Sequence, residues 1–572
     1  MLTARPVATE PELNFPDAEL KPPRRSSAGG RAELAGPVVG VLLGLVLVRH
    51  TVGGRPPAGE DVMAHLIRAD FAVPHLIAHL RPDGWFPRLV LGQQEFLFNG
   101  PGLTWLVAAL RAVTFGALST TGALKVVAIA GIAALPPVVA FLARSYGLSR
   151  AAAGLAAVLS LLVSSPYGPG LQGTFVVGLV SHQVGSVLFC VALGAAVRSL
   201  DGGGRRWPTL AAFAGGGLLI THLISALILA VFVGLTVLSR AAVGRLSRPG
   251  LGRLVAIAAG AAGLAAFWLV PMVAHRDLRG VYTGWDTPAL LTRLGEIATG
   301  GVLLPAGLAV LVLAGWLHQL FRATGRPSVW VLVPAAYLPL AYGLLHLFGP
   351  SELTLQLPNR GLGYVGLLAV FAVAAPVAGA AGRWGRAGHV AALVLAGAAV
   401  LAFAPGRGAP GQLPEPHPEL LAAAAALREL VPPGARFATQ RDFPNEIGRT
   451  GIIHPETWLA RVSGRNSLNG FNLEAVSTPD AALEPETLDA DDPSASADRL
   501  ARFGVSHVVI TDDPVTVRLT RSERFRPVWH ASPITILAVE PRDGAPPPAS
   551  LVDSPVPLAA FLLDVRAEHV GV

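Results

Sequence analysis

The sequence predicts a polytopic α-helical membrane protein that carries an extracytoplasmic α/β domain at its C-terminal end. Apolar residues make up 52% of the 572 residues, and charged residues make up only 14%. Long apolar runs recur between Gly36 and Pro405, far more of them than the cores of soluble domains need. After about residue 409 the sequence becomes polar and then alternates helix-like and strand-like segments, which indicates a separate soluble domain.

The apolar runs account for about eleven spans, which form a transmembrane domain over residues 35–404. Because residues 1–35 are polar and proline-rich, we expect the first apolar run to be retained as a span rather than cleaved as a signal peptide. The expected spans are residues 36–50, 122–143, 151–164, 181–198, 208–221, 223–239, 254–273, 299–320, 328–347, 361–380 and 388–404.

Positive charge in the short loops orients these spans in the cytoplasmic membrane. The polar tail, residues 1–34, ends in a basic cluster that includes Arg24, Arg25 and Arg31, so the positive-inside rule places it in the cytoplasm. Eleven crossings then place residues 405–572 outside. Residues 1–404 carry a net formal charge of +14 and residues 405–572 carry −7. Since the basic excess lies mostly in short loops, it does not indicate nucleic-acid binding.

The first outer loop, residues 53–120, contains an apolar segment that we expect to lie on the membrane. Pro101–Phe115 is short for a span and carries Arg111. If this segment crossed the bilayer, Arg144 and Arg150 would lie outside, against the positive-inside rule. We therefore predict an interfacial helix on the outer face.

Residues 405–572 have the pattern of a soluble α/β domain of about 160 residues, a usual domain size. We expect helices at Pro418–Leu430 and Ala495–Phe503, the first of them ended by a Pro-Pro-Gly sequence. The strand-like segments are Arg436–Thr439, Val505–Thr511, Arg526–His530 and Thr535–Val539.

The single cysteine, Cys190, lies in an apolar run and excludes an intramolecular disulfide. The strong preference for arginine over lysine is typical of a GC-rich bacterial genome.

The first outer loop carries the side chains best suited to catalysis. Glu60 and Asp61 follow the first span, His65 lies one helical turn after Asp61, and Arg68 lies near the same face. Asp61 can serve as a general base that takes the proton from a substrate hydroxyl group, with Glu60 as a second candidate. In the structural alternative the two carboxylates only begin the loop helix, a role that suits Glu60 better.

Arginines outside the membrane are candidates for binding a phosphate, because the guanidinium group offers several N–H donors in one plane. Arg360 lies where an outer loop enters a span, and Arg88, Arg276 and Arg279 are also outside in this topology. The candidate substrate-binding residues are therefore His65, Arg88 and Arg360. Arg360 is equally compatible with a role as an interfacial anchor.

The remaining histidines and tryptophans fit structural roles. His65 has the alternative of a packed polar residue, and one Asp with one His is too few for a metal site. His222 is interpreted as a satisfied polar residue between helices, and His507 as part of a buried strand. The tryptophans are expected in interfacial belts. No functional signal is assigned to His182 or His275, and the belt tryptophans include Trp268 and Trp330.

The acidic pair and the following membrane-surface helix resemble the layout of the GT-C glycosyltransferases, membrane enzymes that take sugars from polyprenyl-phosphate carriers. In that superfamily an acidic residue of the first outer loop acts at the acceptor. More narrowly, the chain resembles bacterial membrane proteins named for a relation to 6-pyruvoyl-tetrahydropterin synthase. They share an Asp…His opening, a Gly-x-x-Pro-Arg stretch (here Gly84–Arg88) and a Gly-Val-x-His-Val-Val stretch (here Gly504–Val509). The resemblance covers most of the chain and implies no pterin chemistry.

This resemblance implies transfer of a hexosyl or pentosyl group from a polyprenyl-phosphate donor to a glycan or lipid acceptor of the cell envelope. It implies no definite cofactor and leaves a divalent metal open. Two alternatives remain: a flippase or transporter of lipid-linked sugars, and a non-catalytic assembly protein. The expected spans contain no Asp or Glu, which disfavours an ion-coupled transporter but not an uncoupled flippase.

Overall fold

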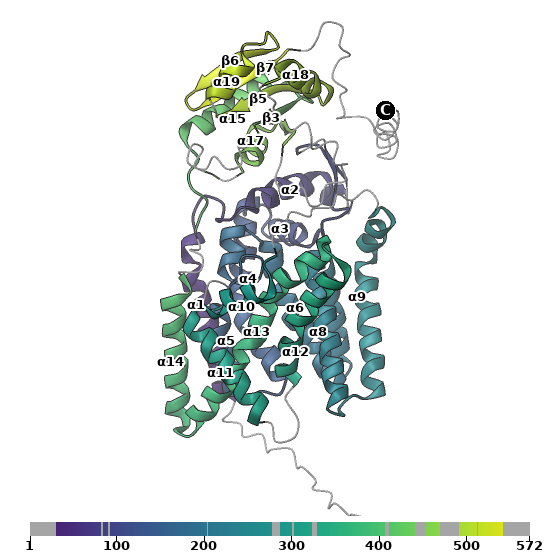
Figure 1. The fold of residues 1–572 in the computed structure, drawn as a ribbon, viewed down its shortest axis with the longest axis vertical. Coiled ribbons are helices and arrows are strands. Elements are labelled where there is room, and N and C mark those ends of the chain that lie inside the picture. The colour runs from purple at the N-terminus through teal and green to yellow at the C-terminus, as the bar shows by residue number, and fades with distance from the viewer. Residues whose placement is uncertain are drawn as a thin grey trace, which may run out of the picture.

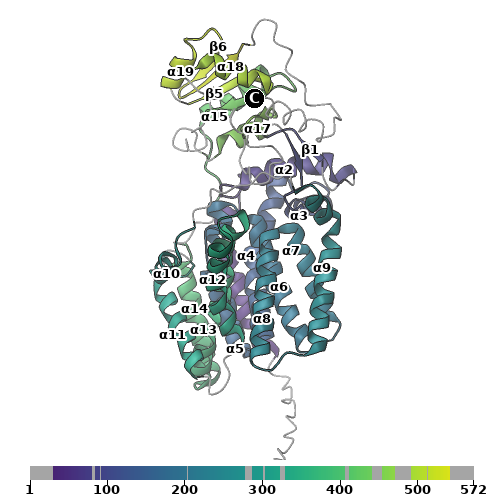
Figure 2. The same ribbon diagram turned by 45° about the vertical axis from the view of Figure 1, so that its right-hand side comes forward.

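The computed structural model describes residues 30–540, apart from residues 80, 82–83, 90–91, 203, 277–286, 300–302, 323–328, 406–410, 441–451, 453, 470–490 and 512. These residues form a long body of roughly parallel helices with an α/β domain at one end (Figure 1). Two short helices and a hairpin from the first outer loop lie between the body and the domain (Figure 2). The chain is therefore arranged in three layers along its long axis.

Each predicted span overlaps a helix of the body. In chain order these are α1 (Gly30–Leu47), α4 (Thr120–Ser145), α5 (Arg150–Leu159), α6 (Val180–Leu200), α7 (Arg206–Thr221), α8 (Leu223–Ala242), α9 (Arg248–Ala274), α11 (Ala306–Arg322), α12 (Val329–Phe348), α13 (Glu352–Gly382) and α14 (Gly385–Phe403).

Seven helices of the described chain are long and apolar enough to cross a membrane: α4, α6, α8, α9, α12, α13 and α14. The apolar parts of α1, α5 and α11 are shorter, and α7 has 16 residues. Large apolar side chains on the outside of the body, such as Val255 and Leu395, are 70% exposed, as expected of surfaces that contact lipid. The structure thus supports a multi-pass membrane protein, and the count of eleven spans stays a prediction.

α13 begins earlier than the sequence indicated. The predicted span starts at residue 361, whereas the helix starts at Glu352, after a capping box formed by Ser351 and Thr354. The helix packs against α5, α8, α11, α12 and α14, and most of its side chains are buried. Gln356, Asn359 and Arg360, which resemble a loop in the sequence, are therefore helical and buried.

The first outer loop forms the middle layer. It contains α2 (Val62–His75), the antiparallel hairpin of β1 (Gly84–Phe86) and β2 (Gln93–Glu95), and α3 (Gly102–Val113). α3 corresponds to the predicted interfacial helix; its 12 residues span about 18 Å, too short to cross a bilayer. Val113 and the following Phe115 are 69% and 98% exposed, which suits a helix end at a membrane surface.

The α/β domain contains the strands that the sequence predicts. Its sheet has the order β4-β3-β5-β7-β6, in which β3 is parallel to β4 and β5, and β7 is antiparallel to β5 and β6. Its elements are α15 (Pro418–Leu430), β3 (Arg436–Thr439), α17 (Pro455–Ser463), β4 (Asn466–Ser467), α18 (Pro493–Arg502), β5 (Val505–Ile510), α19 (Asp513–Leu519), β6 (Phe525–Ala531) and β7 (Ile534–Val539). The sequence analysis missed α17, β4 and α19.

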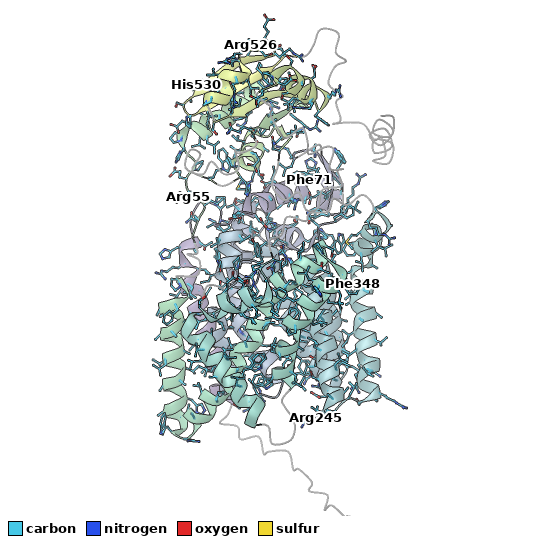
Figure 3. All side chains as sticks on the ribbon, viewed as in Figure 1. Arg55, Phe71, Arg245, Phe348, Arg526 and His530 are labelled. Carbon is cyan, nitrogen blue, oxygen red and sulfur yellow. The ribbon has the colours of Figure 1, made fainter. Side chains whose placement is uncertain are left out.

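The α/β domain is attached to the first outer loop at several points. The linker before α15 pairs with the loop: Ala58 N–H donates to the Gly411 carbonyl at 2.9 Å, and Leu413 N–H donates to the Pro56 carbonyl at 2.8 Å. Farther along, Arg461 Nε of α17 lies 2.7 Å from Asp70 Oδ2 of α2. Figure 3 shows Arg55 at the same end of the body as the domain, and Arg245 at the opposite end.

Candidate active site

A polar cavity of about 140 Å³ is lined by residues of α2 and of the segment before α3. Both elements lie at the end of the helical body that faces the α/β domain (Figure 1). The cavity walls come from α2, the segment between β2 and α3, the start of α6, the junction of α7 and α8, and the first half of α13. Several ionisable side chains line this cavity, which is typical of a catalytic or ligand-binding site and not of a packed core. They are Asp61, His65, Arg68, Glu95, His222 and Arg360.

The backbone around Asp61 is held by the segment that precedes α6. The N–H groups of Glu60 and Asp61 donate to the carbonyls of Val176 and Val177 at 3.1 and 2.8 Å. Gly178, next in that segment, has a φ of +88°, and a Cβ there would lie 2.8 Å from the Asp61 nitrogen. Only glycine fits this close approach in a left-handed conformation, so the position of Asp61 depends on the start of α6.

The two carboxylates of the acidic pair face different surroundings. Asp61 directly precedes α2, but its side chain makes no capping hydrogen bond and lines the cavity. Glu60 does not line the cavity; burial raises the pKa of its carboxyl, and the nearby His454 of the α/β domain lowers it. Of the two, only Asp61 is placed to reach a ligand in the cavity.

His65 lies one turn after Asp61 on α2 and also lines the cavity. The pKa of His65 is lowered to about 4, mainly by burial and also by the charge of Arg68, while a hydrogen bond with the Gly178 backbone partly opposes both. The ring is therefore neutral near pH 7. Within the described part of the chain its Nε2 atom has no hydrogen-bond partner, and this atom could contact a ligand.

A buried ion pair forms another wall of the cavity. Arg68 and Glu95 are 5% and 1% exposed, and Arg68 Nε lies 3.4 Å from Glu95 Oε1. With its amide oriented to satisfy both partners, Asn99 accepts from the two terminal nitrogens of Arg68 at 2.9 and 3.3 Å. The neighbouring Phe96 has a φ of +64°, a strained conformation of the kind that clusters at functional sites. The sequence analysis placed Arg68 near the face of His65 but missed Glu95 and Asn99.

Arg360 lines the cavity from α13 and is only 5% exposed. Its Nε donates to Gln356 Oε1 at 2.7 Å, and its Nη1 lies 3.4 Å from His222 Nε2. His222, which the sequence analysis interpreted as a packed polar residue, therefore belongs to the cavity wall. The sequence did hold a signal: Thr221-His222 is the polar step at which two predicted spans meet.

Arg88, the remaining predicted substrate-binding residue, contacts the α/β domain instead of the cavity. Its carbonyl accepts from Ser467 N–H at 2.8 Å, and its Nη1 donates to the Ala460 carbonyl at 3.4 Å. Burial lowers the pKa of its guanidinium, the nearby Asp70 raises it, and Arg465 lowers it. In this structure Arg88 helps to hold the domain in place.

Other sequence predictions have mixed outcomes. Trp268 and Trp330 are 4% and 5% exposed, so the expectation of interfacial belts is wrong for both, because each packs inside the helical body. His507 lies on the buried strand β5, as predicted. Arg276 is exposed, and Arg279 lies outside the described residues.

The described residues contain no group of three or more His, Cys, Asp or Glu side chains placed to hold a metal ion. Asp61 and His65 alone offer two ligands, fewer than a metal site needs.

An apolar groove of about 520 Å³ lies on the other side of α13, between α10 (Leu290–Ala298), α11, α12 and α13. Its lining is almost entirely hydrocarbon, and the indole N–H of Trp316 is satisfied by the Val331 carbonyl at 3.0 Å. Arg293 of α10 is 8% exposed and donates to Asn359 Oδ1 at 2.8 Å. Asn359 directly precedes Arg360, so the buried Arg293 contacts α13 one residue away from Arg360.

Comparisons with known proteins identify the fold. The chain is similar to the oligosaccharyltransferase AglB from Archaeoglobus fulgidus, solved with an inhibitory peptide and a dolichol-phosphate (TM-score 0.59, 13% identity, 91% of this chain and 75% of that one). It is also similar to a structure of the same enzyme with Zn and sulfate (TM-score 0.55, 15% identity, 83% of this chain and 68% of that one). The arabinofuranosyltransferase AftD from mycobacteria gives a TM-score of 0.56 at 16% identity, over 90% of this chain and 40% of that one.

No protein-family model and no curated protein matches the chain. Its resemblance to the proteins named for 6-pyruvoyl-tetrahydropterin synthase therefore stays a prediction. The similarity extends over most of this chain. The protein therefore shares its fold with AglB and AftD.

Proposed function

We propose that this protein is a membrane glycosyltransferase that moves a sugar from a polyprenyl-phosphate donor to a cell-envelope glycan or lipid on the outer face of the cytoplasmic membrane. The observation that carries the proposal is the cavity, in which the carboxylate of Asp61 and the buried guanidinium of Arg360 line the same small space. The fold shared with two kinds of glycosyltransferase supports it, as does the dolichol-phosphate in the AglB complex.

The two groups suit the two ends of the reaction. Asp61 accepts the proton of the acceptor hydroxyl as the hydroxyl oxygen bonds to the anomeric carbon of the sugar. The bond between that carbon and the phosphate oxygen breaks, and the electron pair leaves with the phosphate. Arg360 stabilises the negative charge of the departing polyprenyl phosphate through charge-assisted hydrogen bonds. Neutral His65 can hydrogen-bond a sugar hydroxyl between them.

The apolar groove supports a lipid-linked donor. Arg360 and Val365 are five residues apart on α13, about 7.5 Å along the helix axis, and Val365 lines the groove whereas Arg360 lines the cavity. We propose that the isoprenoid chain of the donor lies in this groove, with Arg293 near its polar end. Each buried CH₂ group contributes about 0.8 kcal/mol.

The proposal is tested by incubating membranes that contain the protein with a panel of radiolabelled polyprenyl-phosphate sugars. Loss of label from one donor, with transfer to envelope material, is the expected result. Membranes with the Asp61→Asn variant at equal abundance are the control, and chelator-treated membranes test the need for a divalent metal. A protein that consumes no donor, or an Asp61→Asn variant that is as active as the wild type, would contradict the proposed activity.

A further inference from the structure

His222 lies between α7 and α8, and its imidazole reaches Arg360 on α13. The residue has an extended backbone (φ −157°, ψ 90°), and its Nδ1 faces Ser225, 3.2 Å from the Ser225 backbone nitrogen at the start of α8. On the other side of the ring, Nε2 lies 3.4 Å from Arg360 Nη1. The imidazole therefore connects the start of α8 to the proposed phosphate-binding arginine on α13.

Four side chains form a closed ring around this contact. Tyr364, one turn after Arg360 on α13, donates its hydroxyl to Ser225 Oγ at 2.6 Å, and Ser225 Oγ lies 2.7 Å from His222 Nδ1. Arg360 and Tyr364 on one helix thus contact His222 and Ser225 on the other. The ring of His182 stacks on that of His222 at a centroid distance of 4.4 Å, which restrains the imidazole plane.

The chemistry of the groups determines the protonation of His222. A guanidinium carries only donors, so His222 Nε2 must be unprotonated to accept from Arg360. The neutral ring then carries its proton on Nδ1 and can donate it to Ser225 Oγ. A doubly protonated ring would place a second positive charge against Arg360 with no hydrogen bond between them. The neutral imidazole therefore holds one terminal nitrogen of the guanidinium while Gln356 holds its Nε.

We propose that His222 is a positioning residue for donor binding: it orients the Arg360 guanidinium toward the phosphate of the donor. This inference rests on the phosphate-binding role of Arg360 proposed above. Without the imidazole acceptor, the arginine can rotate about its long side chain, and the entropy of fixing it must be recovered when the donor binds.

Two substitutions separate this role from a structural role at the start of α8. In His222→Gln, the side-chain oxygen reaches the position of Nε2, so the contact with Arg360 is kept and the contact with Ser225 is lost. In His222→Asn, the side-chain oxygen takes the position of Nδ1 and can accept from Ser225 N–H, so the start of α8 stays stabilised and the contact with Arg360 is lost. The measurements are KM for the donor, kcat, and thermal stability in detergent, with Arg360→Ala measured in parallel.

We expect His222→Asn to raise the donor KM by about tenfold or more, the scale of a lost hydrogen bond to a charged group, with unchanged thermal stability. His222→Gln should stay within a few fold of the wild-type KM. The inference is wrong if Arg360→Ala raises the donor KM and His222→Asn does not, or if both His222 variants raise it equally. If Arg360→Ala itself leaves the donor KM unchanged, the phosphate-binding role is wrong as well.

Discussion

The two sides of the cavity are held in place by different means. On the acidic side, Asp61 lies in a loop, and backbone hydrogen bonds to Val176 and Val177 fix its position. On the basic side, Arg360 lies inside the 31-residue helix α13, and the side chains of Gln356 and His222 orient it. The proposed base thus depends on how the first outer loop packs, whereas the proposed phosphate site depends on a polar network within the helical body.

This difference has a consequence for the α/β domain. The loop that carries Asp61 is paired with the linker of that domain, and Asp70 of α2 forms an ion pair with Arg461 of α17. No such connection involves α13 among the described residues. A movement of the domain would therefore shift the proposed base relative to the phosphate site, and the two sides should respond differently to substitutions.

Apart from replacement of Asp61 itself, the largest effect is expected from disturbing the backbone on the acidic side. In Gly178→Ala, the new Cβ would lie 2.8 Å from the Asp61 nitrogen and displace the loop. A shift of about 1 Å in a catalytic group can lower the rate by about a hundredfold, so turnover should fall on that scale. Transfer assays on purified protein measure it.

Gly116→Ala is the matched control for backbone strain. Gly116 also has a left-handed φ, +80°, but a Cβ there would meet nothing within 4 Å. Its turnover should stay near that of the wild type. Equal losses in the two variants would mean that strain, and not displacement of Asp61, causes the effect.

A smaller effect, and on binding, is expected on the basic side. Arg360→Ala removes a charge-assisted donor and should raise the donor KM by roughly tenfold to a hundredfold. Arg360→Lys keeps the charge but loses the planar donor geometry, so its KM should fall between those of the alanine variant and the wild type. A change in kcat without a change in KM, in either variant, would contradict the assignment of Arg360 to the donor phosphate.

The smallest effect is expected on the pH dependence of the protein's stability, which the protonation of His65 should change. Its pKa is about 4 in the folded protein against 6.5 ordinarily, so the unfolded chain binds a proton first as the pH falls. The free energy of unfolding should therefore fall by about 1.4 kcal/mol for each pH unit of acidification between these two values, and it should keep its full size above pH 6.5. Thermal unfolding in detergent at pH about 7 and about 5 should show a smaller acid loss for His65→Asn. Equal losses in both proteins would show that His65 does not titrate in this way.

Local patterns in the sequence predicted the features that depend on neighbouring residues. Apolar runs located the helices of the body, and the spacing of Asp61 and His65 predicted that both lie on one side of α2. The start of α13 was missed because Gln356, Asn359 and Arg360 resemble a loop, although each finds a partner inside the protein. β4 was missed because it has only two residues, too few for an alternating pattern.

Contacts between distant segments could not be predicted in this way. His222 and Arg360 are 138 residues apart, and neither one's local sequence indicates the other. The same holds for Gly178 and Asp61, whose close approach depends on how the segment before α6 packs on the outer loop. The sequence therefore indicated Asp61 and Arg360 separately, whereas their common cavity and the contacts of His222 and Gly178 are visible only in the structure.

The central claim is that Asp61 is the base of a sugar-transfer reaction in this cavity, and the most direct test compares Asp61→Asn with Glu60→Gln. Asparagine keeps the size of the side chain but cannot accept the acceptor proton, so kcat should fall by about a hundred- to ten-thousandfold with little change in the donor KM. Glu60 does not line the cavity, so Glu60→Gln should keep kcat within a few fold of the wild type. Near-normal transfer by a correctly inserted Asp61→Asn variant would contradict the account, most clearly if Glu60→Gln abolished transfer.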